Sequence, residues 1–280
     1  MEALAARALD APAPGAAADI LRAILAQHGD SVAAVLFYGA CRRDADGTGL
    51  LDVYVLYDRH RAYHGSPVMA GLTAVLPPHV VFLRAGNATA KVAALSCAQF
   101  ARRVRPGSLD TTIWARFCQP ATLLHARDAD ARRRVIAMLA QAMETGALWA
   151  LRLGPPTGDP ALCWQALFAR TYGAELRPER RNRPALIYQA DRAWFDAALT
   201  LVQARPAFWW RAAWLARRLC GKPLNLLRLV KAALTFENGT EYILAKLARH
   251  GAARIVPSAW QRRHPLLAAP VLLWRIRTGR

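Results

Sequence analysis

FYGACRRDADGTGLLDVYVLYD, the stretch over residues 37–58, decides the fold that we expect of this chain. It completes an apolar run over residues 32–38, turns at Gly39, crosses a polar loop, and resumes as a β-branched and aromatic run over residues 50–57. Apolar runs of this length between glycine-rich turns are typical of buried strands. The stretch therefore predicts two strands joined by a loop, with Asp52 on the second strand, 13 residues after Gly39.

Helical and strand patterns alternate on either side of this stretch. A helix is expected over residues 20–28, because Asp19 is a residue type that caps helix starts and Gly29 one that ends them. Residues 20–125 consequently have the pattern of an α/β domain. The further predicted elements are strands over residues 79–83 and 91–96 and a helix over residues 128–153.

The segment GPPTGDP at residues 154–160 predicts a linker, since it combines three prolines with two glycines. Two helices separated by a charged segment are expected in the part that follows. The domain prediction is an α/β domain over residues 1–153, a helical domain over 161–204, and a basic amphipathic region over 205–280.

The net charge predicts an acidic partner. The chain carries a formal charge of +19, of which +13 falls in residues 205–280 through 15 Lys or Arg and two Glu. Nucleic acid, anionic lipid and nucleotide all satisfy this charge. The 54% share of apolar residues excludes disorder as the main state.

Cysteine usage and hydropathy limit the class of protein further. The five cysteines are far apart and form no C-x-x-C pair, so neither a zinc site nor a disulfide framework is predicted. No apolar run is long enough to be a transmembrane segment, and the charged N-terminus does not fit a signal peptide. We expect a cytoplasmic protein that is soluble or peripheral on a membrane.

The spacing from Gly39 to Asp52 resembles the layout of polymerase-β-type nucleotidyltransferases. A glycine at a strand end lets backbone N–H groups approach a triphosphate, while a carboxylate on the next strand holds Mg²⁺ that bridges the phosphates. That pattern has serine or glycine after the first glycine and a second acid two residues after the first. Ala40 and Tyr54 occupy those places. An ordinary strand pair with a turn glycine is the alternative.

Six short segments, in their order along the chain, resemble motifs of the mitochondrial-type phosphatidate cytidylyltransferases, a family with a nucleotidyltransferase fold. The single acid of the second strand is a trait of that family. Ala40 stands where the family has serine, and Gln119 where it has lysine. The segments are YGAC (38–41), LDVY (51–54), KVAALS (91–96), WARFCQPA (114–121), RTYGAELR (170–177) and RIVPSA (254–259).

The resemblance implies an α+β protein: a polymerase-β-like nucleotidyltransferase domain, then a helical domain and the basic amphipathic C-terminal region. The implied reaction joins CTP and phosphatidic acid to give CDP-diacylglycerol and pyrophosphate, with Mg²⁺ as cofactor. Asp52 would hold the metal. The implied catalytic residues are Asp52, Lys91 and Glu175, and the implied nucleotide-binding residues are Gly39, Ala40, Lys91, Arg116 and Arg177.

Aromatic and basic residues alternate at the start of the C-terminal region. Tryptophan with arginine on one helix is typical of a segment that lies on an anionic membrane surface. A core helix with solvated arginines, or a surface that stacks on RNA or single-stranded DNA, is the alternative; the family resemblance favours lipid. The predicted membrane residues are Trp209, Trp210, Trp214, Arg211, Arg217 and Arg218.

Two other functions remain open. One is a nucleic-acid-binding protein whose nucleotidyltransferase-like site has lost its chemistry, which Ala40, Tyr54 and the +19 charge would fit. The other is a nucleotidyltransferase that acts on RNA or protein as the acceptor.

Overall fold

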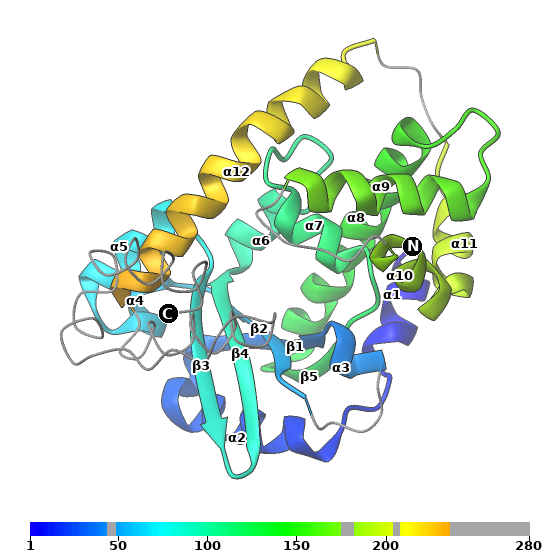
Figure 1. The fold of residues 1–280 in the computed structure, drawn as a ribbon. Helices are drawn as coiled ribbons and strands as arrows, with labels where there is room; N and C mark the ends of the chain where they lie inside the picture. Colours follow the sequence, from blue (N-terminus) through cyan, green and yellow to red (C-terminus); the bar gives the residue numbers. More distant parts are fainter. Residues whose placement is uncertain (44–48, 175–181, 204–207, 236–280) are drawn as a thin grey trace, which may run out of the picture. The chain divides into compact units, whose positions relative to one another are not determined.

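The fold is described from a computed structural model, which describes residues 1–43, 49–174, 182–203 and 208–235 (Figure 1). The chain divides into two compact units, Met1–Asn225 and Leu226–Arg280. Glu175, Arg177 and the RIVPSA segment lie outside the described residues, as does most of the predicted basic C-terminal region.

A five-stranded mixed sheet forms the centre of the first unit, with the strand order β3-β4-β2-β1-β5 (Figure 1). The neighbours β2 and β4 run parallel, and the other three neighbouring pairs run antiparallel. The strands are β1 (Val32–Tyr38), β2 (Leu51–Tyr57), β3 (His79–Ala85), β4 (Ala88–Ser96) and β5 (Thr122–Ala126).

Helices cover both faces of the sheet, which explains why every residue of β1 is buried. On one face, Phe37 and Val55 pack with Ile20 of α2 (Gly15–His28). On the other face, Leu36 and Leu56 join a core built by α6 (Cys97–Arg103), α7 (Thr111–Phe117) and α8 (Ala129–Leu153). The result is an α/β arrangement in three layers.

The predicted strands are confirmed, and so is the helix over 128–153, which Asp128 caps by accepting from the Ala131 N–H at 2.7 Å. The helix expected over residues 20–28 begins earlier, at Gly15, so Asp19 is not its cap. The strand β5 was not predicted, because its five residues, TLLHA, give too short a pattern.

The helices after the predicted linker pack onto the same core. A Cβ at Gly154 would lie 2.7 Å from Cα of Cys163, so α9 (Pro160–Ala174) approaches the end of α8 closely. Trp149 and Trp164 belong to the same buried cluster as Leu56. The division between the two compact units falls between Asn225 and Leu226.

The remaining helices are short, apart from α12. The second helix expected in 161–204 is divided at Asp191 into α10 (Arg183–Ala190) and α11 (Arg192–Thr200). No helix of the described residues is long and apolar enough to cross a membrane. The others are α1 (Glu2–Leu9), η1 (Gly29–Ser31), α3 (Ala40–Arg43), α4 (His60–His64), α5 (Pro67–Val75) and α12 (Trp210–Thr235).

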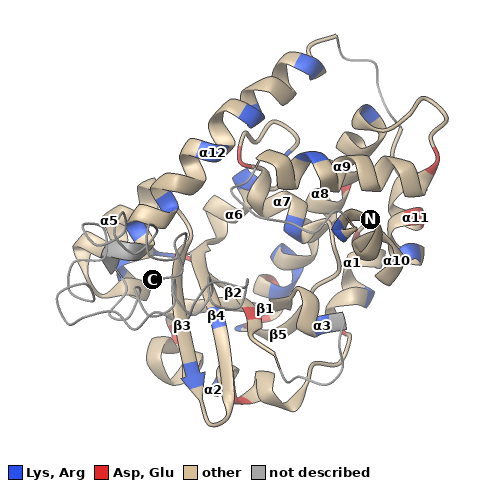
Figure 2. Ribbon diagram, viewed as in Figure 1, with Lys and Arg blue, Asp and Glu red and all other residues tan. Residues whose placement is uncertain are grey.

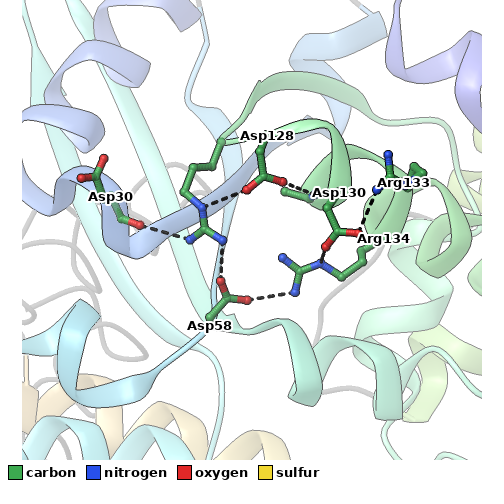
Figure 3. A network of polar contacts seen from close by, with 8 residues as sticks. Asp30, Asp58, Asp128, Asp130, Arg133 and Arg134 are labelled. Atoms are coloured by element: carbon green, nitrogen blue, oxygen red, sulfur yellow. Dashed lines mark hydrogen bonds and ion pairs between the residues drawn. The ribbon is translucent and has the colours of Figure 1, made fainter.

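Ion pairs stabilise the C-terminal end of β2, which is the end farther from Asp52. Asp58, just beyond β2, accepts from Arg127 at 2.8 Å and from Arg134 of α8 at 3.0 Å (Figure 3). Arg127 also donates to the carbonyl of Asp30 and to the carboxylate of Asp128. Burial alone would raise the pKa of Asp58, but the hydrogen bonds from the two arginines outweigh it and lower that pKa.

Candidate active site

Gly39 and Asp52 lie against each other at one end of the β1–β2 pair. The antiparallel register places Tyr38 opposite Asp52, so Gly39 follows directly beside that carboxylate. Gly39 has φ +90°, a conformation that residues with a side chain rarely adopt. A Cβ at this position would lie 3.0 Å from Oδ2 of Asp52. The backbone conformation therefore favours glycine, and an added Cβ would have to displace the Asp52 carboxylate.

Lys91 lies beside Asp52 on the next strand. The parallel register of β2 and β4 pairs Asp52 with Lys91, so both side chains leave the same face of the sheet. Phe82 of β3 is paired with Lys91 in turn. The structure therefore brings together three of the residues predicted for the site, Gly39, Asp52 and Lys91, with Ala40 as the first residue of α3.

An aromatic layer occupies the place of a second acid. Tyr54, two residues after Asp52 on the same face, is 2% exposed. Its ring lies 5.2 Å from that of Tyr38 and 4.9 Å from that of Phe117 in α7, in both cases edge to face. A carboxylate here would be buried among rings, and a buried charge costs several kcal/mol unless it is paired and hydrogen-bonded. The packing thus accounts for the single acid.

Asp52 is the carboxylate that could hold a cation at this site. No group of three or more His, Cys, Asp or Glu side chains among the described residues has the arrangement of a metal site. Mg²⁺ commonly takes one or two carboxylates and completes its shell with water and substrate phosphates. Asp52 fits that mode of binding, in which the nucleotide supplies the remaining oxygens, and does not fit an all-protein metal cage.

Arg42, on α3 just after Gly39, was not among the residues predicted for the site. Its Nε donates to Oγ1 of Thr122 at 3.2 Å, and its Nη1 lies 3.8 Å from Oδ1 of Asp191. It thereby fastens α3, which follows Gly39, to β5 and to the junction of α10 and α11. The run Cys41-Arg42-Arg43 was the available signal, but Thr122 and Asp191 are too distant in sequence to suggest it.

Arg116, Glu175 and Arg177 are the remaining predicted site residues. Arg116 is half-buried on α7, where its Nη1 donates to the carbonyl of Thr112 at 2.6 Å. Phe117, the next residue, lies in the aromatic layer beside Tyr54. The predicted site residues Glu175 and Arg177 are outside the described residues.

Two of the six predicted membrane residues are buried, which corrects that part of the expectation. Trp214 is 4% exposed and lies 5.4 Å from the Trp149 ring, and Arg217 is 1% exposed. The guanidinium of Arg217 donates to the carbonyls of Ala213 and Pro106. Burial, and secondly the charge of Arg152, lowers the pKa of Arg217 to about 10. These side chains stabilise the interior because α12 packs against protein at this face.

The other four predicted membrane residues reach the surface. Trp209, Arg211 and Arg218 are exposed, Trp210 is partly buried, and Phe208 beside them is 98% exposed. The described part of α12 carries six Lys or Arg and no acidic residue (Figure 2). The surface at the start of α12 is therefore both basic and apolar.

Comparisons with known proteins add little to this geometry. No family model and no curated protein matches the chain. A solved nucleotidyltransferase-like protein from Exiguobacterium sibiricum 255-15 aligns over 92% of this chain and 90% of its own, at 10% identity and a TM-score of 0.29. A similarity at that score carries no argument about fold or activity, so the site has to be judged on its own residues.

Proposed function

We propose that this chain is a nucleotidyltransferase whose reaction takes place at the corner formed by Gly39 and Asp52. The observation that carries the proposal is the contact between the two: a glycine at φ +90° whose missing Cβ leaves the Asp52 carboxylate open to a ligand. A turn that only reversed the direction of the chain would not need a glycine this close to a carboxylate.

The residues of the corner have complementary roles toward a triphosphate. The absence of a side chain at Gly39 lets phosphate oxygens approach the backbone N–H groups of Gly39 and Ala40. Lys91, paired with Asp52 across the parallel strands, adds positive charge on the same face. A Mg²⁺ ion on Asp52, when bound, neutralises the charge that develops on the phosphates. Arg42 holds α3 in place, so that the N–H groups keep their direction.

The proposed substrates are CTP and phosphatidic acid, a choice that rests on the sequence resemblance. A phosphate oxygen of the lipid would attack the α-phosphorus of CTP and form a phosphoanhydride, while the bond to the β-phosphate breaks and pyrophosphate leaves. Arg116, Arg177 and Glu175 are proposed to contact the nucleotide or assist the transfer, as the resemblance implies. A lipid acceptor requires a protein that is peripheral on a membrane, and exposed Phe208 and Trp209 support this.

A second candidate is a nucleic-acid-binding protein that has lost transfer chemistry. Tyr54 in the aromatic layer and the +19 charge favour it, since neither requires catalysis. A third is nucleotidyl transfer to another acceptor. Both leave the Gly39–Asp52 contact in place, but only the third uses it for catalysis.

One assay separates these functions. The full-length chain is incubated with α-labelled CTP, Mg²⁺ and phosphatidic acid in mixed micelles, in parallel with ATP, GTP and RNA acceptors. Labelled lipid from CTP alone is the expected result. Label on RNA, or lipid labelled equally from every nucleotide, would contradict the substrates. No label in any arm, together with tight RNA binding, would contradict nucleotidyl transfer itself.

A further inference from the structure

Two adjoining surface cavities lie between α9 and the first half of α12, apart from the Gly39–Asp52 corner. Their volumes are about 380 and 420 Å³, and both are lined by Leu215 and Arg218. Arg170 of α9 lines one, and Lys222 lines the other. All the lining residues belong to the unit Met1–Asn225. Together they form a continuous groove, which we name the α9–α12 groove.

The groove exists because the two helices approach closely at one point. A Cβ at Gly221 would lie 2.6 Å from the carbonyl oxygen of Ala174, so the α12 backbone touches the end of α9 there. Larger side chains on either side of Gly221 then hold the helix surfaces apart. Gly173, beside Ala174, leaves the groove open at this end.

Positive charge lines the groove. Arg211, Leu215, Arg218 and Lys222 are spaced by three or four residues, which places them on one face of α12. Arg170 faces them from α9, and all four cations are exposed. Of the described residues, none that lines the groove is acidic, and none forms an ion pair with these cations. An anion would therefore find cations that no carboxylate of the described residues neutralises.

Apolar surface lies between the cations. Leu215 is 53% exposed and Leu219 is 66% exposed, and Pro223 continues this strip. Exposed leucines next to unpaired arginines provide two chemistries within one groove, a site for phosphate and a surface for hydrocarbon.

We propose that the α9–α12 groove binds an anionic glycerophospholipid. Arg170 and Arg218 hold the phosphate, and Leu215 and Leu219 lie along the acyl chains. The exposed aliphatic side chains favour lipid over nucleic acid, which takes aromatic faces for base stacking. Two tryptophans line the groove: Trp214 is buried against Trp149, and Trp210 is partly buried with the Arg211 guanidinium over its ring, 5.3 Å from the centroid. The inference concerns binding rather than chemistry, so it holds whether or not Asp52 is catalytic.

The test measures binding of the full-length chain to vesicles without nucleotide or Mg²⁺. Phosphatidylcholine vesicles with and without phosphatidic acid are sedimented with the wild-type chain and with the R170Q/R218Q variant. A cation near an anionic surface contributes about fivefold to binding, so the loss of two predicts roughly 30-fold weaker partitioning. The L215Q/L219Q variant should lose the binding that remains at high salt. Asp52→Asn should bind vesicles as the wild type does.

Matched controls separate the groove from bulk charge and bulk hydropathy. R7Q/R61Q removes the same charge from exposed positions elsewhere and should weaken binding by about threefold at most, because salt screens distant charges. V68Q/V75Q removes exposed apolar surface from α5 and should leave binding unchanged. Circular dichroism verifies that each variant is folded, and R211Q/K222Q provides a second pair should R170Q/R218Q fail to fold.

Three outcomes would overturn the proposal. Equal losses in R170Q/R218Q and R7Q/R61Q would show that net charge alone binds the vesicles. Full competition by glycerol 3-phosphate would show that the groove binds a phosphate without the lipid. Retention of a short RNA at moderate salt, with phosphatidic acid vesicles ignored and the RNA lost in R170Q/R218Q, would identify the groove as a nucleic-acid surface.

Discussion

The backbone of Gly39 faces the carboxylate of Asp52 so closely that a side chain at position 39 would compete with any ligand of that carboxylate. The two residues are 13 positions apart, and the antiparallel register of β1 and β2 brings them together. The distance from an added Cβ to Oδ2 would be 3.0 Å. Backbone conformation and site access can thus be tested at the same position.

Gly39→Ala should reduce stability and also block the site. A positive φ costs an alanine about 1–2 kcal/mol, and the new methyl group would displace the Asp52 carboxylate. Gly65→Ala is the matched control, since Gly65 has φ +64° and no atom within 4 Å of the added Cβ. Both variants should unfold at lower urea concentrations, whereas only Gly39→Ala should lose transfer activity. Equal activity in the two variants would contradict a site at this corner.

Asp52→Asn should abolish transfer while the fold remains intact, because the change removes charge and almost no volume. We expect a loss of about 10²-fold or more in pyrophosphate release, and weaker Mg²⁺–CTP binding in calorimetry. Asp159→Asn is the control. Asp159 caps α9 by accepting from the Leu162 N–H, and asparagine is an equally good cap. Wild-type turnover in Asp52→Asn would rule out its assignment to the metal.

Arg217 and Arg218 are adjacent on α12, but replacing each by alanine should change the free energy of unfolding by very different amounts. Arg217 lies over the Trp149 ring, 4.3 Å from its centroid, and donates to the Pro106 carbonyl. Arg217→Ala should lower the free energy of unfolding by about 3 kcal/mol through lost packing and hydrogen bonds. Arg218→Ala should leave it unchanged, because that side chain is exposed. Urea denaturation measures both, and equal effects would contradict the burial of Arg217.

The stability of the protein should fall in acid partly through Asp58. Hydrogen bonds from Arg127 and Arg134 hold the pKa of Asp58 below its ordinary value of 3.8. A lowered pKa in the folded state contributes stability above the unfolded pKa, and this contribution is lost as the pH falls through the folded pKa. The unfolding free energy of Asp58→Asn should therefore be lower than that of the wild type near neutral pH.

The difference in unfolding free energy between the wild type and Asp58→Asn should shrink as the pH falls below 3.8, the ordinary pKa of aspartate. Asp10→Asn is the control variant, because it breaks only the exposed ion pair between Asp10 and Arg132. Denaturation curves recorded across the acid range test the prediction. A difference in unfolding free energy between the wild type and Asp58→Asn that stays constant with pH would contradict the prediction.

Local sequence pattern determined the strands and the glycine corner. The apolar runs that became β1, β2 and β4 are buried on both faces, so their composition alone indicates strands. The closeness of Gly39 to Asp52 could be predicted from the sequence, because a single loop joins β1 and β2. The strand β5 escaped prediction, since five residues after Pro120 carry too little periodicity. The division of the expected helix at Asp191 escaped it as well.

Only the tertiary structure decided what lies opposite each side chain. The parallel register that sets Lys91 beside Asp52 depends on the crossover through β3, and the contacts of Arg42 join segments that are far apart in the chain. The same holds for α12. Its alternation of tryptophan and arginine fits a lipid surface and a protein core equally, and the Trp149 ring and the Pro106 carbonyl decide that Trp214 and Arg217 face protein. A sequence pattern specifies that a helix face will be covered, whereas packing between distant segments determines what covers it.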